Sequence, residues 1–200
     1  MATTFGAQGL TKAYAGTTVL DSLTFTTTPG RAFAVRGSNG AGKTTLLRCL
    51  NGTSRADAGL VLLDGAPCDP GGRRAWVDVY GVLDDFTWFP GLTVADHLAM
   101  LDPDADPARA LGRFGAGELA DRTATSLSTG QMRRAALATT LVRPWRVLLL
   151  DEPEQRLDDE GAQLLVGELK AFLADGRCVV LSTHSDALVA ALDAEELRLG

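Results

Sequence analysis

The sequence lacks the features that mark membrane, secreted and disulfide-rich proteins. Its aliphatic runs are short: Val147–Leu150 has four residues, far fewer than the ~18 that a membrane span needs. The N-terminal stretch MATTFGAQGL lacks the basic and then apolar regions of a signal peptide. Cysteine occurs only at Cys49, Cys68 and Cys178, without a CxxC pair, so neither a metal site nor a disulfide framework is indicated. These absences favour a cytoplasmic protein whose thiols are buried and reduced.

Positive charge is also scarce. The sequence has 19 Lys and Arg against 25 Asp and Glu, which gives a net charge of −6. Because a phosphate backbone needs a basic binding face, duplex DNA and RNA are excluded as main partners. Hydrophobic residues make up 46% of the 200 residues, which is enough for a sizeable core and excludes a disordered chain.

Apolar patterning in the first third predicts strands and one helix. TTVLDSLTFTT and RAFAVRG alternate at period two, which predicts antiparallel strands with Pro29-Gly30 as the turn between them. TTLLRCLNGT predicts a helix with Leu46, Leu47 and Leu50 on one face. A further strand is expected over residues 60–63, before an Asp-Gly turn.

After the first third, the chain has a mostly helical segment and then a second α/β segment. From about residue 84 to 141, acidic and proline-rich stretches interrupt helical patterns such as VADHLAMLD and QMRRAALATTLV. VLLLDEP and CVVLSTH then predict buried parallel strands, with the amphipathic helix GAQLLVGELKAFLAD between them. We therefore predict one α/β domain over residues 1–200, with a core of 1–83 and 142–200 and a compact helical insertion over about 84–141.

A glycine-rich loop lies between a predicted strand and a predicted helix. Its sequence GSNGAGKT fits G-x-x-x-x-G-K-[ST], whose glycines let backbone N–H groups converge on phosphate oxygens at a helix N-terminus. Lys43 is expected to reach the β- and γ-phosphates, and the Thr44 hydroxyl to bind magnesium. A chance glycine loop is disfavoured by the strand–loop–helix context. The predicted nucleoside triphosphate site consists of Gly37, Ser38, Asn39, Gly40, Ala41, Gly42, Lys43, Thr44 and Thr45.

Two carboxylates follow the apolar strand VLLL. Ligand sites in parallel sheets lie at the carboxyl ends of strands, so Asp151 is placed to hold magnesium. The next residue, Glu152, can polarise an attacking water. Asp-Glu-Pro alone could equally be a strand-ending turn, but a phosphate loop in the same chain favours catalysis.

Five residues narrow the class of nucleotide hydrolase. Leu127-Ser128-Thr129-Gly130-Gln131 precedes a predicted helix and resembles the LSGGQ signature of ATP-binding cassette (ABC) ATPases. In this order and spacing the pattern is specific, and the resemblance covers the whole chain. It implies a P-loop NTPase core of RecA type with an N-terminal antiparallel β subdomain and an inserted helical subdomain.

The resemblance also implies roles for residues outside these motifs. Tyr14 matches the aromatic residue that stacks on adenine, with Val19 beside it, and Asp84 falls at the Q-loop as a possible magnesium or water ligand. His184 is similar to the switch histidine, and Arg156-Leu157-Asp158 resembles the D-loop. Two departures stand out: Asp84 replaces the commonest Gln, and Thr129 replaces a glycine of the signature. An acidic loop without nucleotide contact is the alternative for Asp84.

In this family two subunits sandwich two ATP molecules. The resemblance therefore implies a second copy, or a related subunit, whose signature residues Ser128, Thr129, Gly130 and Gln131 act in trans. It also implies a separate transmembrane permease that holds the protein at the inner face of the cell membrane, and no nucleic acid. The short chain is similar to small exporter ATPases such as those of haem export. The alternative is a soluble ABC ATPase outside transport.

Three further residues are predicted to have no specific functional role. His97, in VADHL, is predicted to be an ordinary helix residue. Arg133 and Arg134 are expected on a solvated or interface face of the helix that follows the signature.

Overall fold

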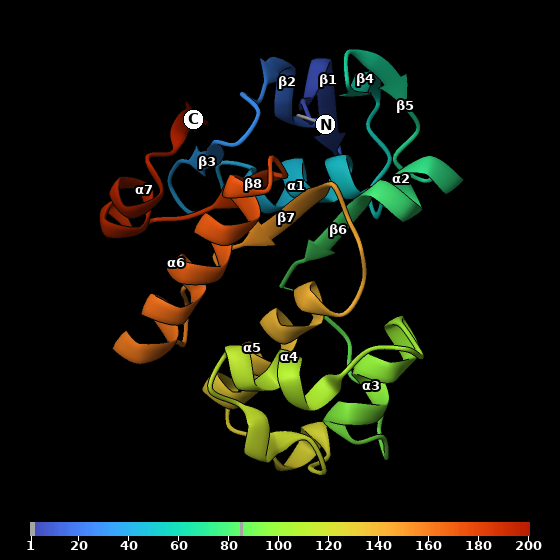
Figure 1. The fold of residues 1–200 in the computed structure, drawn as a ribbon. Helices are drawn as coiled ribbons and strands as arrows, with labels where there is room; N and C mark the ends of the chain where they lie inside the picture. Colours follow the sequence, from blue (N-terminus) through green and yellow to red (C-terminus); the bar gives the residue numbers. More distant parts are fainter. Residues whose placement is uncertain (1–2, 85) are drawn as a thin grey trace. The chain divides into compact units, whose positions relative to one another are not determined.

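The computed structural model describes residues 3–84 and 86–200, and it contains an antiparallel and a parallel sheet (Figure 1). The described chain divides into two compact units, which are considered in turn. The first unit holds the residues up to Asp84, Trp145–Glu152 and Leu169–Gly200, and the second holds the segment after Asp84 up to Pro144 and Pro153–Glu168.

The antiparallel sheet has four strands within the described part of the chain, in the order β2-β1-β4-β5. One of its faces packs on the core: Phe5, Leu10 and Leu20 are each 1% exposed. The N-terminal antiparallel sheet was predicted and is confirmed. Its strands are β1 (Phe5–Tyr14), β2 (Thr17–Thr26), β4 (Ala58–Leu63) and β5 (Ala66–Cys68).

The second sheet is parallel, with the order β6-β7-β8-β3-β9. Every residue of β7 and β8 is buried, which explains why these strands appear in the sequence as near-continuous apolar runs. The predicted α/β fold is therefore confirmed. The strands are β3 (Ala32–Arg36), β6 (Val79–Val82), β7 (Val147–Asp151), β8 (Cys178–Ser182) and β9 (Glu195–Arg198).

The predicted hairpin across Pro29-Gly30 is wrong. β2 pairs with β1, whereas β3 lies between β8 and β9 in the parallel sheet. The four residues Ala32–Val35 are all buried, as a central parallel strand requires, so the period-two pattern was too short to be decisive. Pro29-Gly30 instead carries the chain from one sheet to the other. The Phe25 and Phe33 rings stack with centroids 4.8 Å apart, so the two segments meet through side chains and not through a strand ladder.

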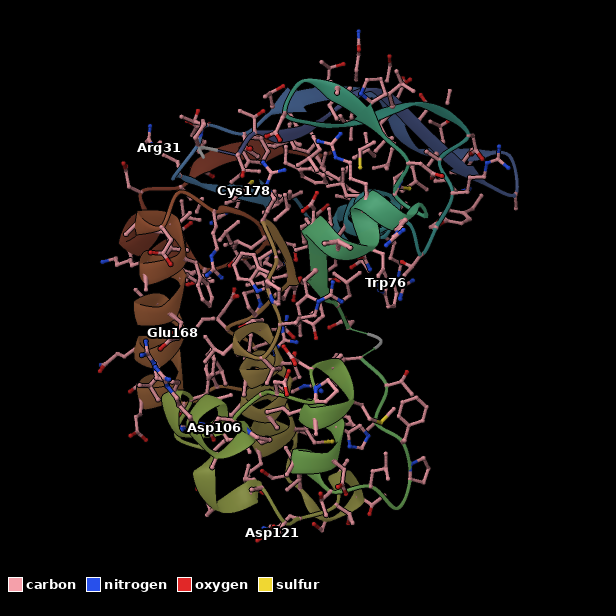
Figure 2. The ribbon with its side chains drawn as sticks, turned by 45° about the vertical axis from the view of Figure 1, so that its right-hand side comes forward. Arg31, Trp76, Asp106, Asp121, Glu168 and Cys178 are labelled. Carbon is pink, nitrogen blue, oxygen red and sulfur yellow. The ribbon has the colours of Figure 1, made fainter. Side chains whose placement is uncertain are left out.

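Helix α1 lies in the same hydrophobic core as strands from both sheets. Leu46, Leu47 and Leu50 are fully buried among residues such as Phe5 and Leu149, which confirms the predicted helix and its apolar face. The helices of this unit are α1 (Lys43–Asn51), α2 (Arg73–Asp78), α7 (Asp186–Leu192) and the C-terminal part of α6 (Asp159–Ala174). Trp76 of α2 is 74% exposed (Figure 2).

The second unit is built from helices. Leu98, Leu111, Phe114 and Leu119 form its core at 1% exposure or less, and the two helical patterns seen in the sequence are confirmed. Its elements are α3 (Val94–Leu101), α4 (Pro107–Arg113), α5 (Thr129–Ala138), the first part of α6, and the short 3-10 turns Gly117–Leu119, Ala124–Ser126 and Thr139–Leu141. Over residues 3–84 and 86–200, none of the helices has the length and apolar character needed to cross a membrane.

All three cysteines are buried and unpaired, as the sequence predicted. Cys178 on β8 is fully buried, and its Sγ donates to Thr27 Oγ1 over 3.2 Å (Figure 2). The same Thr27 oxygen accepts from the Phe5 amide over 2.9 Å, so this thiol belongs to a buried network between the two sheets. Burial raises the pKa of Cys178 to about 12, because the thiolate has no solvation there.

We expect Cys178 to resist thiol reagents in the folded protein. With a pKa of about 12, the thiolate fraction at about pH 8 is only on the order of 10⁻⁴. Titration with a chromogenic disulfide reagent, followed by mass mapping, measures this. The denatured chain is the control and should react at all three cysteines. Modification of native Cys178 as fast as in denaturant would contradict the buried network.

Candidate active site

The carboxyl ends of four neighbouring parallel strands bring the predicted residues of the first unit to one sheet edge. In the register, Val35 pairs with Ser182, which in turn pairs with Asp151. Gly37, Glu152 and His184 each follow their strand by one or two residues, so they lie at the same edge. Ligand sites of parallel sheets are expected at this position.

The glycine-rich loop needs glycine where it meets β2. Gly42 has φ of 98°, in the left-handed region, and a Cβ there would lie 2.9 Å from Val19 Cγ1. Gly42 is also the N-cap of α1 and provides no side-chain cap, so the first N–H groups of that helix are available to an anion.

One cavity of about 300 Å³ gathers most of the predicted nucleotide residues. It brings the loop and the helix start together with a strand-end carboxylate, Glu152. Gly37, Ser38 and Ala41 belong to the same loop but do not line this cavity. Its lining residues are Val19, Asn39, Gly40, Gly42, Lys43, Thr44, Thr45 and Glu152.

Lys43 is a buried cation at this cavity, with 6% of its side chain exposed. Its Nζ donates to the carbonyl oxygens of Gly37 and Ser38 over 3.1 and 3.3 Å. It also lies 2.8 Å from His184 Nε2 and 3.7 Å from Glu152 Oε1. Main-chain oxygens and a carboxylate therefore hold the ammonium at the loop.

His184 Nε2 faces two groups with opposite demands. It lies 2.8 Å from Lys43 Nζ, which can only donate, and 3.3 Å from Glu152 Oε1, which as a carboxylate can only accept. A neutral ring that accepts from Lys43 cannot donate to Glu152 through the same nitrogen. The closer contact favours acceptance from Lys43 in this state.

The backbone at Glu152 is unusual for a side-chain-bearing residue. Its φ is 44°, and its amide donates both to the carbonyl oxygen of Ser182, over 3.2 Å, and to Ser182 Oγ, over 2.9 Å. Ser182 Oγ donates in turn to Asp151 Oδ1, and Asp151 is 1% exposed. Left-handed residues of this kind persist where neighbours fix them, and here Ser182 holds the Glu152 main chain and the Asp151 carboxylate.

Tyr14 and Asp84 lie apart from the cavity lining. Tyr14 is 46% exposed, its hydroxyl lies 3.1 Å from Ser54 Oγ, and Lys12 Nζ lies 5.0 Å from its ring centroid. Asp84 is exposed in the turn after β6, the strand next to β7. The structure therefore leaves both as predictions, although Asp84 follows a strand end at the same edge as Asp151.

The predicted signature forms the start of α5 in the second unit. Ser128 is the N-cap: its Oγ accepts from the Gln131 amide over 3.2 Å, and Gln131 Oε1 accepts from the Ser128 amide over 3.0 Å. This reciprocal capping box fixes both side chains. Thr129 is exposed, so a side chain is accommodated at that position. At Gly130 a side chain would clash, because its Cβ would lie 2.9 Å from the Arg156 carbonyl oxygen.

Arg134 was expected on a solvated or interface helix face, and the solvated alternative is wrong, because only 12% of its side chain is exposed. It donates to the carbonyl oxygen of Phe114 over 3.1 Å and to Asp158 Oδ1 over 2.5 Å. Asp158 Oδ1 also accepts from the Gly161 amide. The pKa of Asp158 is lowered, most by the bond from Gly161 and next by the bond from Arg134. The burial of Arg134 could not be predicted from the local sequence pattern, because its partner Asp158 lies 24 residues away along the chain.

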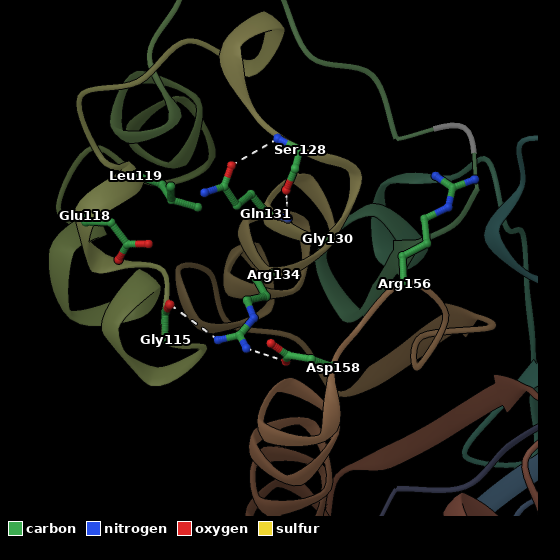
Figure 3. Close-up of a pocket in the computed structure, with 9 residues that line it drawn as sticks. All are labelled: Gly115, Glu118, Leu119, Ser128, Gly130, Gln131, Arg134, Arg156 and Asp158. Atoms are coloured by element: carbon green, nitrogen blue, oxygen red, sulfur yellow. Dashed lines mark hydrogen bonds and ion pairs between the residues drawn. The ribbon is translucent and has the colours of Figure 1, made fainter.

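A second cavity, of about 340 Å³, adjoins these residues (Figure 3). Figure 3 shows the Arg134 guanidinium turned toward Asp158, whereas that of Arg156 points away from both. Arg156 adopts φ of 67°. The lining residues are Gly115, Glu118, Leu119, Ser128, Gly130, Gln131, Arg134, Arg156 and Asp158.

Comparison with known proteins agrees with this geometry. The family model described as ABC transporter matches residues 20–155. The chain is a member of the ABC transporter family. The predicted resemblance is therefore confirmed, and the chain is an ABC-type ATPase, the ATP-binding unit that the family couples to transport.

Two ABC relatives are similar over most of the chain. The cytochrome c biogenesis ATP-binding export protein CcmA of Ruegeria pomeroyi is 39% identical, over 94% of this chain and 87% of that protein. The Nod factor export ATP-binding protein I of Paraburkholderia xenovorans is 37% identical, over 86% of this chain and 60% of that protein.

Solved ABC structures share the fold. An ATP-binding subunit of an ABC transporter matches with a TM-score of 0.87 at 20% identity, over 98% of this chain and 85% of that one. A bacterial Atm1-family ABC exporter with ATP bound matches with a TM-score of 0.89 at 22% identity, over all of this chain and 37% of that one.

We expect Lys43→Ala to weaken ATP binding ~10- to 100-fold, the value of one or two charge-assisted hydrogen bonds. Calorimetry at fixed magnesium and salt measures the affinity. Lys170→Ala is the matched control, because Lys170 is exposed on α6 and should leave affinity unchanged. An unchanged affinity in Lys43→Ala would remove Lys43 from the nucleotide site.

Proposed function

We propose that this ABC ATPase powers export of a substrate across a membrane, as a dimer bound to separate permease subunits at the cytoplasmic face. One observation carries the catalytic part: the side chains of Lys43, Glu152 and His184 lie within 3.7 Å of one another, and Lys43 and Glu152 line one cavity. The export proteins among its relatives support the direction of transport.

Glu152 is the proposed general base. A water attacks the γ-phosphorus, the bond from that phosphorus to the β-phosphate oxygen breaks, and the water proton passes to Glu152, giving ADP and phosphate. The bonds from its amide to Ser182 hold the Glu152 main chain at the strand end, and the residue lines the cavity.

Lys43 and His184 are proposed to exchange partners when nucleotide binds. The ammonium then has phosphate oxygens in place of its contacts with the loop carbonyls. Once Lys43 turns to the phosphates, His184 Nε2 is released, and it can donate to Glu152 or to the γ-phosphate. His184 thereby orients the base.

Magnesium fits the donor set of this edge. The Thr44 hydroxyl and the carboxylates of Asp151 and Asp84 would hold the ion, since Mg²⁺ prefers oxygen ligands. Thr44 lines the cavity and Asp151 ends β7. The ion, when bound, neutralises charge on the phosphates.

The signature helix is proposed to complete the site of a second copy. At the start of α5, the exposed Ser128 hydroxyl and the N–H groups of Thr129 and Gly130 present donors at a positive helix end. Binding of the γ-phosphate between two copies would favour the closed dimer, and hydrolysis would remove that preference.

A small apolar cavity of the second unit is the proposed contact for the permease. It has a volume of about 190 Å³ and lies beside Phe89, which is 53% exposed. An apolar side chain of a cytoplasmic permease helix fits its chemistry. Its lining residues are Trp88, Phe89, Pro90, Gly91, Ala124, Thr125 and Met132.

We expect Glu152→Gln to bind ATP but to hydrolyse it ~10²–10⁴-fold more slowly, because the amide keeps the size of the side chain and loses the base. Phosphate release measures turnover, and nucleotide affinity is determined on the same sample. Glu154→Gln, two residues further along, is the matched control. Hydrolysis at the wild-type rate in Glu152→Gln would assign the base elsewhere.

We expect Mg-ATP to drive dimerisation of the Glu152→Gln variant. On a sizing column with light scattering, its mass should double from 21.0 kDa. Adding Ser128→Arg should prevent the shift, since a bulky side chain would occupy the γ-phosphate position. A dimer that persists without nucleotide, or with Ser128→Arg, would refute the sandwich.

A further inference from the structure

A buried histidine holds the aromatic segment, residues 86–92, that precedes α3. Phe89 of this segment is 53% exposed, whereas His97 of α3 is 7% exposed. Both ring nitrogens of His97 meet main-chain groups: Nδ1 lies 2.7 Å from the Thr93 carbonyl oxygen, and Nε2 lies 2.6 Å from the Phe89 amide nitrogen. A residue of α3 is thus hydrogen-bonded to the segment that precedes the helix.

Aromatic rings enclose the imidazole. The Trp88 ring meets it edge to face with centroids 4.9 Å apart, and the Phe89 ring stacks on it at 5.8 Å with 16° between the planes. Phe86 contacts Trp88 in turn, with centroids 5.0 Å apart. His97 is therefore the centre around which the aromatic segment packs.

The two main-chain partners fix the protonation state of the ring. The Phe89 N–H can only donate, so Nε2 must accept; the Thr93 oxygen can only accept, so Nδ1 must donate. Only the neutral imidazole with its proton on Nδ1 satisfies both. A proton on Nε2 would place its N–H opposite the Phe89 N–H, so that neither could accept. The hydrogen bond between His97 and Phe89 would then be lost.

Within residues 86–200, the charged groups near this ring lie on α3 and on the segment that bonds its start. Asp96 is on α3 itself, and its carboxylate is engaged by the amide and hydroxyl of Thr93. The segment that bonds the start of α3 carries Asp121 and Arg122, and Arg122 donates to Ser126. The aromatic segment, FTWFPGL, contains no titratable side chain. The two hydrogen bonds from Thr93 lower the pKa of Asp96, so this carboxylate stays ionised beside the ring.

We propose that His97 is a positioning residue whose neutral ring holds the aromatic segment in the conformation that presents Phe89. Protonation of the ring releases the Phe89 amide, so this surface is sensitive to acid. The consequence for docking rests on the proposed function, since the aromatic segment lines the cavity assigned to the permease.

Nuclear magnetic resonance of the chain without any partner tests the role of His97. The sequence has two histidines, so the ring signal missing from His97→Gln identifies His97. We expect the Nδ1–H tautomer at about pH 8, and a Phe89 amide shift that moves with the ring midpoint as pH falls to about 5. An Nε2–H tautomer, or a Phe89 amide that ignores the ring titration, would overturn the proposal.

Two variants separate positioning from simple packing. The Oε1 of His97→Gln can still accept from Phe89 and does not titrate, so the Phe89 amide should stay protected and stop following pH. His97→Leu has no acceptor and should exchange that amide ~10-fold faster at every pH. Equal protection in His97→Leu and the wild type would overturn the proposal. Because no permease is present, these results stand apart from the test of docking.

Discussion

The pairing of parallel strands is the constraint on which the candidate active site depends. β3, β7 and β8 lie side by side in register, so the residues that follow them emerge at one edge. Each strand is buried over nearly its whole length, and a slip of one residue would turn side chains to the opposite face of the sheet. The register thus sets where Gly37, Glu152 and His184 meet.

The charge of Lys43 is the second constraint. A cation with 6% exposure needs compensation, and the structure provides two loop carbonyls, a histidine nitrogen and the more distant Glu152. These partners hold the ammonium at the cavity. The same contacts connect Glu152 and His184 to Lys43 at the glycine-rich loop, so a change at any one of the three side chains alters the surroundings of the others.

In the second unit, hydrogen bonds from polar side chains also hold functional segments in place. The capping box of Ser128 and Gln131 satisfies the start of α5. Arg134, one turn further along, ties that helix to Asp158. In the same unit His97 ties the aromatic segment to α3. In each case a polar side chain fixes an otherwise irregular backbone, and the fixed backbone presents the residues assigned to partners.

The sequence by itself determined the α/β class, the glycine-rich loop, the pair of carboxylates at the end of a buried strand and the family, because these depend on local order: GSNGAGKT between a strand and a helix, VLLLDE, and LSTGQ before a helix. Only the tertiary structure decided which sheet β3 joins, since a run as short as the four apolar residues Ala32–Val35 suits either kind of strand. It alone showed that Arg134 is mostly buried and that His97 is bound through both nitrogens. Their partners lie on other elements or across a turn, and short-range periodicity carries no information about contacts of that kind.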